Sequence, residues 1–252
     1  MEKEIGLIGF PLAHSFSPKW FGEYFATNHI TNFSYKLFPL PEINQLPLLI
    51  RNHPNLIGLN VTIPHKQSVI NYLDKVPPHA AMIGAVNCMK IERTHQQIVT
   101  TGYNTDCIGF LQSLKPLLKN EHHKALIFGN GGAAQAVKYA LTQLNIQYLV
   151  VSRSLSNETT SYTSLNREIL HSHKLWIHTT PLGMSQYPDS CIDIDLSAIT
   201  PQHLVYDLIY NPEETLLLRE CKARGAQIKN GLEMLHLQAL ESAKIFGLEN
   251  SH

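Results

Sequence analysis

The chain has 252 residues, enough for two modest domains, and its hydrophobic content of 44% allows a sizeable core. Lysine plus arginine and aspartate plus glutamate number 20 each, so nothing in the charge balance favours a nucleic-acid or membrane partner. No stretch reaches the length of a membrane span, and the N-terminus makes a poor signal peptide. The four cysteines are scattered without a C-x-x-C pair, which favours reduced thiols and a cytoplasmic protein.

Short apolar runs alternate with amphipathic segments through the first hundred residues. Pro18 suits the first position of a helix, with Ser17 as its N-cap, and Trp20 and Phe21 begin the apolar face of that helix. This part of the chain is expected to contain strands at residues 5–10, 33–38 and 56–61, helices at 18–25, 41–52, 66–73 and 77–83, and a hairpin of residues 85–91 and 98–102. Strands that alternate with helices predict a mostly parallel sheet.

A glycine-rich turn follows the short apolar run at residues 125–128. Gly129, Gly131 and Ala134 have the spacing G-x-G-x-x-A, and an alanine-rich segment with helical periodicity follows. In this context the first glycine permits a tight turn, the second lets a pyrophosphate approach the backbone, and the alanine lets the helix pack closely on the strand. An ordinary tight turn between a strand and a helix is the alternative, but the flanking elements favour a dinucleotide site.

The next expected strand, residues 147–151, ends in Ser152, Arg153 and Ser154. A site for NAD usually carries an acidic residue near this point, which binds the ribose 2′-hydroxyl. An arginine can instead bind a 2′-phosphate through paired, charge-assisted hydrogen bonds, whereas a carboxylate would repel it. The sequence therefore favours NADP, with a solvated surface arginine as the alternative.

The rest of the chain continues the alternation of strands and helices. Asn104, Thr105 and Asp106 are expected to cap a helix that begins at Cys107, and a domain boundary is placed near Asp106. Helices are expected at residues 107–118, 212–223 and 231–246, strands at 175–178, 204–208 and 226–229, and a polar loop at 154–167.

Eight short motifs then stand along the chain in one order. They are Gly9-x-Pro11-x-x-His14-Ser15-x-Ser17-Pro18, Asn60-Val61-Thr62-x-Pro64-x-Lys66, Gly84-Ala85-Val86-Asn87, Gly102-x-Asn104-Thr105-Asp106-x-x-Gly109, Gly129-x-Gly131-Gly132-Ala133-Ala134, Thr180-Pro181-Leu182-Gly183-Met184, Asp207-x-x-Tyr210-x-Pro212 and Gly231-x-x-Met234-Leu235-x-x-Gln238-Ala239. Several motifs in this order are far more specific than any one of them. From about residue 5 to residue 246, the chain resembles the shikimate dehydrogenase family.

The resemblance implies an α/β fold with two domains and an active site in the cleft between them. Residues 1–105 and 231–252 would form a substrate-binding and catalytic domain, to which the C-terminal helix returns, and residues 106–230 a Rossmann-type NADP-binding domain. The implied activity is that of an oxidoreductase acting on a CH–OH group: the reversible, NADPH-dependent reduction of 3-dehydroshikimate to shikimate, a step of chorismate and aromatic amino acid biosynthesis.

The resemblance also assigns catalytic roles. Lys66 would be the general acid/base, because oxidising a secondary alcohol requires loss of its proton as hydride leaves, and partial burial can bring a lysine into the working range. Asp106 would orient Lys66. Taken alone, Lys66 would be a solvated lysine in the first turn of a helix, and Asp106 a helix N-cap. The residues that would bind the substrate are Ser15, Ser17, Asn60, Thr62, Asn87, Tyr210 and Gln238.

The cofactor would be bound by residues from four segments: Gly129, Asn130, Gly131, Gly132, Ala133, Ala134, Ser152, Arg153, Ser154, Thr180, Gly183, Met184 and Gly231. Two departures from the family are visible in this sequence. The second basic residue that usually follows Arg153 is absent, so NAD is expected to be tolerated beside NADP. His178 and Thr179 stand before Thr180, where the family commonly has an asparagine.

No metal is expected, since the chain lacks H-E-x-x-H and its paired histidines lie in polar connections. The expected partner is a small-molecule substrate, with the protein a monomer or a homodimer. Two alternatives remain: a relative acting on quinate or an aminoshikimate, and a non-catalytic nucleotide-binding regulator. The regulator hypothesis predicts a damaged proton-transfer pair, and both Lys66 and Asp106 are present.

Overall fold

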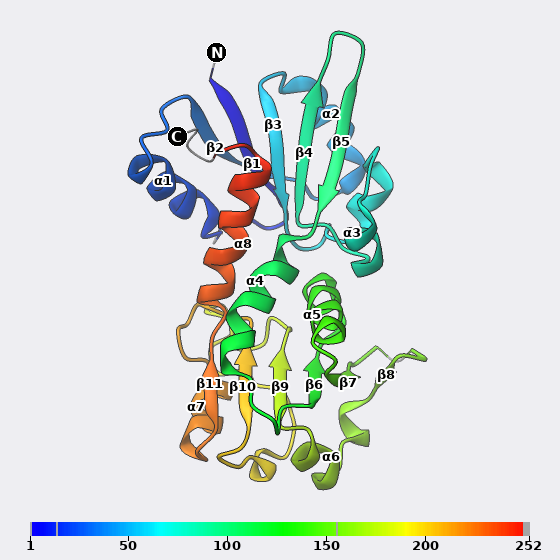
Figure 1. Ribbon diagram of the computed structural model, residues 1–252, viewed down its shortest axis with the longest axis vertical. Helices are drawn as coiled ribbons and strands as arrows, with labels where there is room; N and C mark the ends of the chain where they lie inside the picture. The colour runs from blue at the N-terminus through cyan, green and yellow to red at the C-terminus, as the bar shows by residue number, and fades with distance from the viewer. Residues whose placement is uncertain (1, 14, 155, 249–252) are drawn as a thin grey trace. The chain divides into compact units, whose positions relative to one another are not determined.

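The computed structural model describes residues 2–13, 15–154 and 156–248, and the chain forms two compact units. Unit 1 runs to Ile108 and resumes at Gln238, and unit 2 is Gly109–Leu237 (Figure 1). His14 of the first motif lies outside the described residues, as do the last residues of the predicted substrate domain, 249–252. Both units are α/β, as the sequence predicts.

Unit 1 is built on a five-stranded sheet with the order β2-β1-β3-β4-β5. Its strands are β1 Lys3–Gly9, β2 Phe33–Pro39, β3 Leu56–Val61, β4 Cys88–Arg93 and β5 Ile98–Tyr103. Its helical segments are α1 Ser17–Thr27, η1 Ile43–Gln45, α2 Leu46–Asn52, η2 Ser68–Tyr72 and α3 Pro78–Ile83. β1 pairs in parallel with β2 and β3, whereas β4 is antiparallel to β3 and β5. The sheet is therefore mixed, with the predicted hairpin at one side.

Helices cover both faces of this sheet. On one face Leu46 and Ile50 of α2 pack with Ile8 and Val61. On the other, Trp20 and Phe21 of α1 join Ile5, the residues Ala239 and Ala243 of α8 Leu232–Ile245, and Phe246, which follows α8. Segments from the two ends of the chain thus share one hydrophobic cluster. The last predicted helix, observed as α8, packs on the sheet of unit 1 (Figure 1).

Three local predictions for unit 1 are wrong. Ser17 is not the cap of α1, because the helix already includes it and Phe16 occupies the N-cap position. The segment expected to be a helix over residues 66–73 is only a 3₁₀ turn, η2. Residues 41–45 also fail to join α2, since a separate 3₁₀ turn, η1, precedes that helix.

Unit 2 is built on a six-stranded parallel sheet with the order β11-β10-β9-β6-β7-β8. Its strands are β6 Lys124–Phe128, β7 Gln147–Val151, β8 Thr159–Thr160, β9 Leu175–His178, β10 Leu204–Asp207 and β11 Gln227–Lys229. The chain starts at β6, adds two strands on one side and then three on the other. This is the strand order 3-2-1-4-5-6 of dinucleotide-binding folds, and the order reverses between β6 and β9.

The helical segments of unit 2 are α5 Gly132–Gln143, η4 Tyr162–Ser164, α6 Arg167–Ser172, η5 Leu196–Ala198 and α7 Leu216–Ala223, and α4 Thr105–Leu114 with η3 Lys115–Leu117 leads into them. Leu170 of α6 and Leu218 of α7 pack with Val205 and Trp176 on one face of the sheet. On the other face, Phe110 of α4 lies 5.1 Å from Tyr206 between ring centroids.

Two predictions for unit 2 need correction. α7 begins at Leu216 and not at residue 212, because the Thr215 side chain caps it by accepting from the Leu218 N–H. The predicted loop at residues 154–167 contains the short strand β8, which pairs with β7. Residue 155 of that loop lies outside the described residues.

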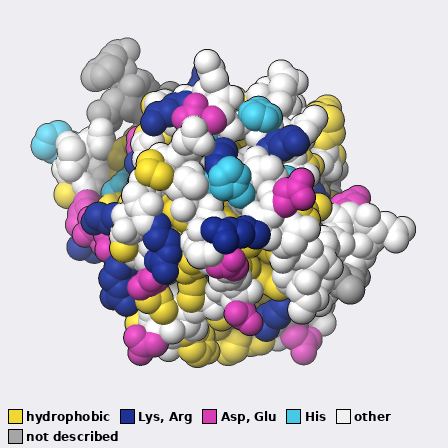
Figure 2. Space-filling model, turned by 90° about the horizontal axis from the view of Figure 1, so that it is seen from below, with side chains coloured by type: hydrophobic (Ala, Val, Ile, Leu, Met, Phe, Trp, Pro, Cys, Tyr) yellow, Lys and Arg dark blue, Asp and Glu magenta, His cyan; other side chains and the backbone are white. Residues whose placement is uncertain are grey.

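Charges of both signs are interspersed on the face that Figure 2 shows, with hydrophobic side chains between them. That face therefore carries no large area of one sign. Within residues 2–13, 15–154 and 156–248, no helix is both long and apolar enough to cross a membrane.

Candidate active site

Lys66 and Asp106 meet in unit 1, where the Lys66 Nζ lies 2.6 Å from the Asp106 Oδ2. Lys66 follows strand β3, and its carbonyl oxygen accepts a 2.7 Å hydrogen bond from the Val86 N–H, which fixes the backbone there. The side chains are 16% and 8% exposed, so the pair is largely withdrawn from water but reachable. The predicted acid/base and its predicted orienting carboxylate are thus in direct contact.

The start of helix α4 supplies the carboxylate of this pair. α4 begins at Thr105, and the Asn104 side chain accepts from the Cys107 N–H at 2.9 Å, so Asn104 is the capping residue. Asp106 therefore stands in the first turn and its carboxylate is directed to Lys66.

A buried amide, Asn87, bonds to Thr105, the residue that precedes Asp106 in the chain. Asn87 is 3% exposed, and its side chain donates to the Thr105 hydroxyl at 2.9 Å and to the Gln238 Oε1 at 3.4 Å. The Asn87 Oδ1 accepts from the Thr105 N–H at 2.6 Å. These bonds join the hairpin, α4 and α8, so the structure brings two predicted substrate residues, Asn87 and Gln238, together.

Asn60 extends the same network. Its side chain donates to the Ser242 hydroxyl at 2.9 Å and accepts from the Tyr35 hydroxyl at 3.0 Å, while Ser242 lies 3.2 Å from the Thr105 hydroxyl. Burial raises the pKa of Tyr35 far above its usual range, against the opposing effect of a hydrogen bond with Ser17. Tyr35 therefore stays a hydroxyl donor and holds the orientation of the Asn60 amide.

The remaining predicted substrate residues are half-buried. Ser15 and Ser17 stand at the start of α1, and the Ser15 hydroxyl accepts from the Ser17 N–H at 3.4 Å. Thr62 follows β3, and its N–H donates to the Ile8 carbonyl at 2.9 Å. Tyr210 belongs to unit 2, in the segment after β10.

Three members of this network were not predicted as site residues. Tyr35 lies on β2, where an aromatic residue suggests only a strand, and Thr105 was read only as part of a helix cap. Ser242 is fully buried on α8, and its position on the apolar face of that helix was the one available signal.

The predicted cofactor residues of unit 2 gather at one edge of its sheet. Residue pairing brings Phe128, Val151 and His178 level with one another at the carboxyl ends of β6, β7 and β9. The segments that follow these three strands hold every predicted cofactor residue except Gly231, which follows β11. Ligands of open α/β sheets bind at this edge, where the strand order reverses.

The glycine-rich turn has the shape that the sequence predicts. Gly129 has a φ of +113°, and a side chain there would meet the Thr179 hydroxyl at 2.5 Å, so only glycine fits. A Cβ at Gly131 would meet nothing within 4 Å, which leaves open space in front of the first turn of α5. Ala134 is fully buried against the strand. The open backbone and the helix N-terminus suit a pyrophosphate.

The segment after β7 presents Arg153 to solvent. Ser152 is 9% exposed and its hydroxyl accepts from the Ser154 N–H at 3.2 Å, whereas Arg153 and Ser154 are exposed. The Arg153 guanidinium is thus available to a ligand, with its backbone held by a local turn.

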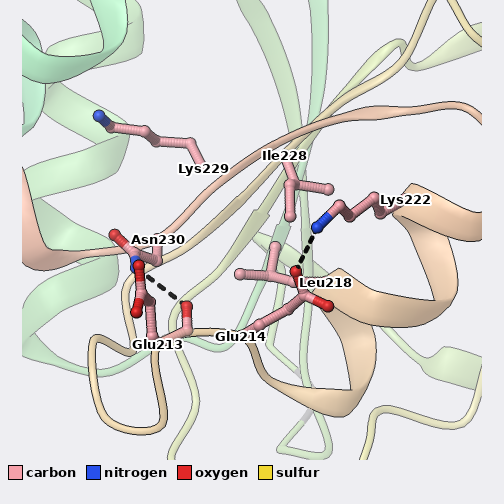
Figure 3. Close-up of a pocket in the computed structure, with 7 residues that line it drawn as sticks. All are labelled: Glu213, Glu214, Leu218, Lys222, Ile228, Lys229 and Asn230. Atoms are coloured by element: carbon pink, nitrogen blue, oxygen red, sulfur yellow. Dashed lines mark hydrogen bonds and ion pairs between the residues drawn. The ribbon is translucent and has the colours of Figure 1, made fainter.

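Unit 2 also has a pocket that is separate from the predicted cofactor residues. It has a volume of about 460 Å³ and is lined by Glu213, Glu214, Leu218, Lys222, Ile228, Lys229 and Asn230 (Figure 3). Figure 3 shows Lys222 pointing to Glu214, and their charged atoms lie 2.8 Å apart. This pocket contains no predicted site residue. In the part of the chain that the structure describes, no three His, Cys, Asp or Glu side chains could together hold a metal ion.

Known proteins match nearly the whole chain. Residues 7–89 match the model of the shikimate dehydrogenase substrate binding domain. A protein of Carboxydothermus hydrogenoformans named shikimate dehydrogenase (NADP(+)) is 36% identical over 255 residues, which cover 94% of this chain and 89% of that protein.

Solved structures agree with this match. A crystal structure of a shikimate dehydrogenase in complex with NADP+ has a TM-score of 0.86 and 32% identity, over 99% of this chain and 91% of that chain. A quinate dehydrogenase from Corynebacterium glutamicum in complex with NAD has a TM-score of 0.84 and 26% identity, over 98% of this chain and 94% of that chain. By its sequence, its fold and the motifs that meet in each unit, this chain belongs to the shikimate dehydrogenase family.

Proposed function

We propose that this chain is a shikimate dehydrogenase that reduces 3-dehydroshikimate to shikimate reversibly with NADPH, as a step of aromatic amino acid biosynthesis. The observation that carries the proposal is the contact of Lys66 with Asp106 beside the buried amides of unit 1. Full-length similarity to proteins named for this activity supports it.

Lys66 is the proposed general acid/base. In the direction of reduction, the ketone carbon gains a hydride, and a proton must reach its oxygen as negative charge develops there. The Lys66 ammonium supplies that proton, and Asp106, 2.6 Å away, holds the ammonium in place. In the direction of oxidation the neutral lysine takes the proton of the alcohol. Bound NADPH supplies the hydride.

Unit 1 is the proposed substrate domain. Ser15 and Ser17 are suited to the substrate carboxylate, since hydroxyls donate to it without adding charge. The amides Asn60, Asn87 and Gln238 and the hydroxyl of Thr62 are suited to the ring hydroxyls, and Tyr210 of unit 2 is proposed to line the pocket. A buried amide rejects an analogue that lacks a hydroxyl, because the amide would then lose its partner.

Unit 2 is the proposed NADP domain. The open backbone in front of α5 fits the pyrophosphate, and the exposed guanidinium of Arg153 fits the 2′-phosphate. Arg153 has no second basic residue three positions later, since residue 156 is a serine, so we expect NAD to be accepted with lower affinity.

Initial rates with purified protein and shikimate test this function, with NADP and NAD compared by the formation of reduced nicotinamide. Fast turnover with NADP is the expected result. Comparable rates with both cofactors would support the shikimate dehydrogenase activity but contradict the predicted preference for NADP over NAD. Absence of turnover with either cofactor would contradict the proposal.

A relative acting on quinate is the second candidate, because a quinate dehydrogenase shares the fold over nearly the whole chain. Both serines of the first motif favour shikimate, and rates with equal concentrations of shikimate and quinate separate the two.

The monomeric or homodimeric state and the cytoplasmic location predicted from the sequence are proposed with the function. Light scattering after size-exclusion chromatography would decide the oligomeric state.

A further inference from the structure

A buried chain of hydrogen bonds in unit 2 joins Asp207 to Thr180 through His178. The His178 Nδ1 lies 2.9 Å from the Asp207 Oδ1, and its Nε2 contacts the Thr180 hydroxyl. His178 is 1% exposed and Asp207 is fully buried. The proton-transfer pair of unit 1 makes no use of these three residues.

The partners of Asp207 decide which nitrogen of His178 carries the proton. The Asp207 Oδ1 accepts from the Ile209 N–H at 3.0 Å, and its Oδ2 accepts from the Thr215 hydroxyl at 2.7 Å. Both carboxylate oxygens are acceptors in these bonds, so the hydrogen between His178 and Asp207 is assigned to the Nδ1. The Nε2 is then left for the hydrogen bond with the Thr180 hydroxyl.

The same hydroxyl begins the turn after β9. Its oxygen accepts from the Leu182 N–H at 3.3 Å, and the Met184 N–H donates to the Pro181 carbonyl at 3.2 Å. Thr180 is thus held from two sides, by His178 behind it and by the backbone of its own turn. Rotation of this side chain would break both bonds.

The turn after β9 packs against the glycine-rich turn and forms a wall beside it. A Cβ added at Gly129 would lie 2.5 Å from the Thr179 hydroxyl and 3.0 Å from the Thr180 Cγ2. β6 and β9, which carry the two turns, are neighbours at the point where the strand order reverses. A dinucleotide in such a sheet lies in the crevice at this point, so Thr180 borders it.

We propose that His178, oriented by Asp207, is a positioning residue for the dinucleotide: it fixes Thr180 and thereby the wall of the glycine-rich turn. The inference rests on the proposed function in taking NADP as the ligand. It assigns no proton transfer to His178. Its effect falls on the binding of the cofactor and leaves the binding of the substrate unchanged.

Two substitutions separate this role from a merely structural one. An asparagine amide can take the place of the Nδ1 and keep the bond to Asp207, but it is too short to reach Thr180. A glutamine amide can take the place of the Nε2 and keep the bond to Thr180 while losing Asp207. If His178 acts through Thr180, His178→Asn weakens NADPH binding about tenfold. His178→Gln then stays within about threefold of the unsubstituted protein.

Binding is measured directly by the change in NADPH fluorescence on titration with protein, and kinetics with shikimate and NADP accompany it. We expect the KM for NADP to follow the Kd for NADPH, and the KM for shikimate to stay within about twofold. Equal binding by both variants and the unsubstituted protein would overturn the inference. The reverse order would also overturn it, with NADPH bound tightly by His178→Asn and weakly by His178→Gln. That result would show that the bond to Asp207 matters and the bond to Thr180 does not.

His203 provides a matched control in the same unit. It is also 1% exposed, and it lies before β10, at the amino edge of the sheet away from the glycine-rich turn. We expect His203→Gln to leave the Kd for NADPH unchanged, and a tenfold loss there would overturn the inference in favour of general destabilisation. An unsubstituted protein that binds NADPH without oxidising shikimate would contradict the proposed function alone, since the binding comparison still decides the role of His178.

Discussion

Lys66 and Asp106 stand 40 positions apart in the chain, yet their charged atoms lie 2.6 Å apart. The contact depends on two independent local structures, the segment after β3 and the first turn of α4. Each residue has a plain alternative role when taken alone, as a solvated lysine or a helix cap. Two features of the structure remove both alternatives: Asn104 caps the helix, and Lys66 is mostly buried.

Replacing Lys66 by alanine tests the acid/base assignment. We expect the substitution to lower kcat with shikimate and NADP by about 10²- to 10⁴-fold, the usual contribution of a positioned proton donor. The KM for shikimate should change little, since the hydroxyls and amides of unit 1 remain. Lys75→Ala, which removes an exposed lysine of the same unit, should leave kcat unchanged. Undiminished turnover by Lys66→Ala would show that another group moves the proton.

Arg153→Ala tests the cofactor preference. Loss of charged hydrogen bonds to a phosphate costs about 1.5–3 kcal/mol, so the KM for NADP should rise roughly 10- to 150-fold, while the KM for NAD stays nearly constant. Arg167→Ala removes an exposed arginine of α6 and serves as the control. A parallel rise in both constants would mean that Arg153 supports the fold of the turn and does not read the 2′-phosphate.

Ser242→Ala tests the buried network of unit 1. Ser242 is fully buried, and its loss would leave the Asn60 amide with an unpaired N–H inside the protein. We expect the free energy of unfolding, measured by urea titration, to fall by about 1–3 kcal/mol. The exposed Ser172 of α6 gives the control Ser172→Ala, which should change stability by less than about 0.5 kcal/mol. Equal stability of the two variants would show that Asn60 finds another partner.

Acid should destabilise the protein through His203. Burial, opposed by the hydrogen bond with the Leu170 carbonyl, lowers the pKa of His203 from 6.5 to about 4. Between these two pH values the unfolded chain binds the proton and the folded protein does not, so the free energy of unfolding falls as the pH is lowered through this window. His203→Gln should flatten that dependence in urea titrations between pH 4 and pH 6.5.

The exposed His95 supplies the comparison for this titration. His95→Gln should retain the full dependence of stability on pH. An unchanged slope in His203→Gln would assign the acid sensitivity to other groups, of which His122 and His173 also have pKa values lowered by burial.

The sequence predicted those features that arise from local patterns. The apolar run at residues 56–61 gave β3 with its observed ends, and the spacing of Gly129, Gly131 and Ala134 gave the turn between β6 and α5. Ends of helices were less predictable. Ser17 looked like a cap because serine accepts well from free N–H groups, but the chain turns one residue earlier and Phe16 takes the position.

Contacts between segments that lie far apart in the chain could not be predicted from the sequence. Nothing in the residues around Tyr35 or Ser242 indicates that both would bond to Asn60, because the contacts depend on how β2 and α8 pack on β3. In the sequence, His178 stands out only as a departure from a family motif. Its bond to Asp207 follows from the register of β9 with β10.

Unit 1 draws its residues from both ends of the chain, and this affects the order in which a newly made chain can fold. Unit 2 is a continuous segment, so it is complete once Leu237 has left the ribosome. Unit 1 at that moment still lacks Ala239, Ala243 and Phe246 from its hydrophobic cluster and Ser242 from its polar network. The half of the protein that is synthesised first is therefore the half that matures last, and a chain released before residue 238 would carry a folded second unit beside an unfinished first one.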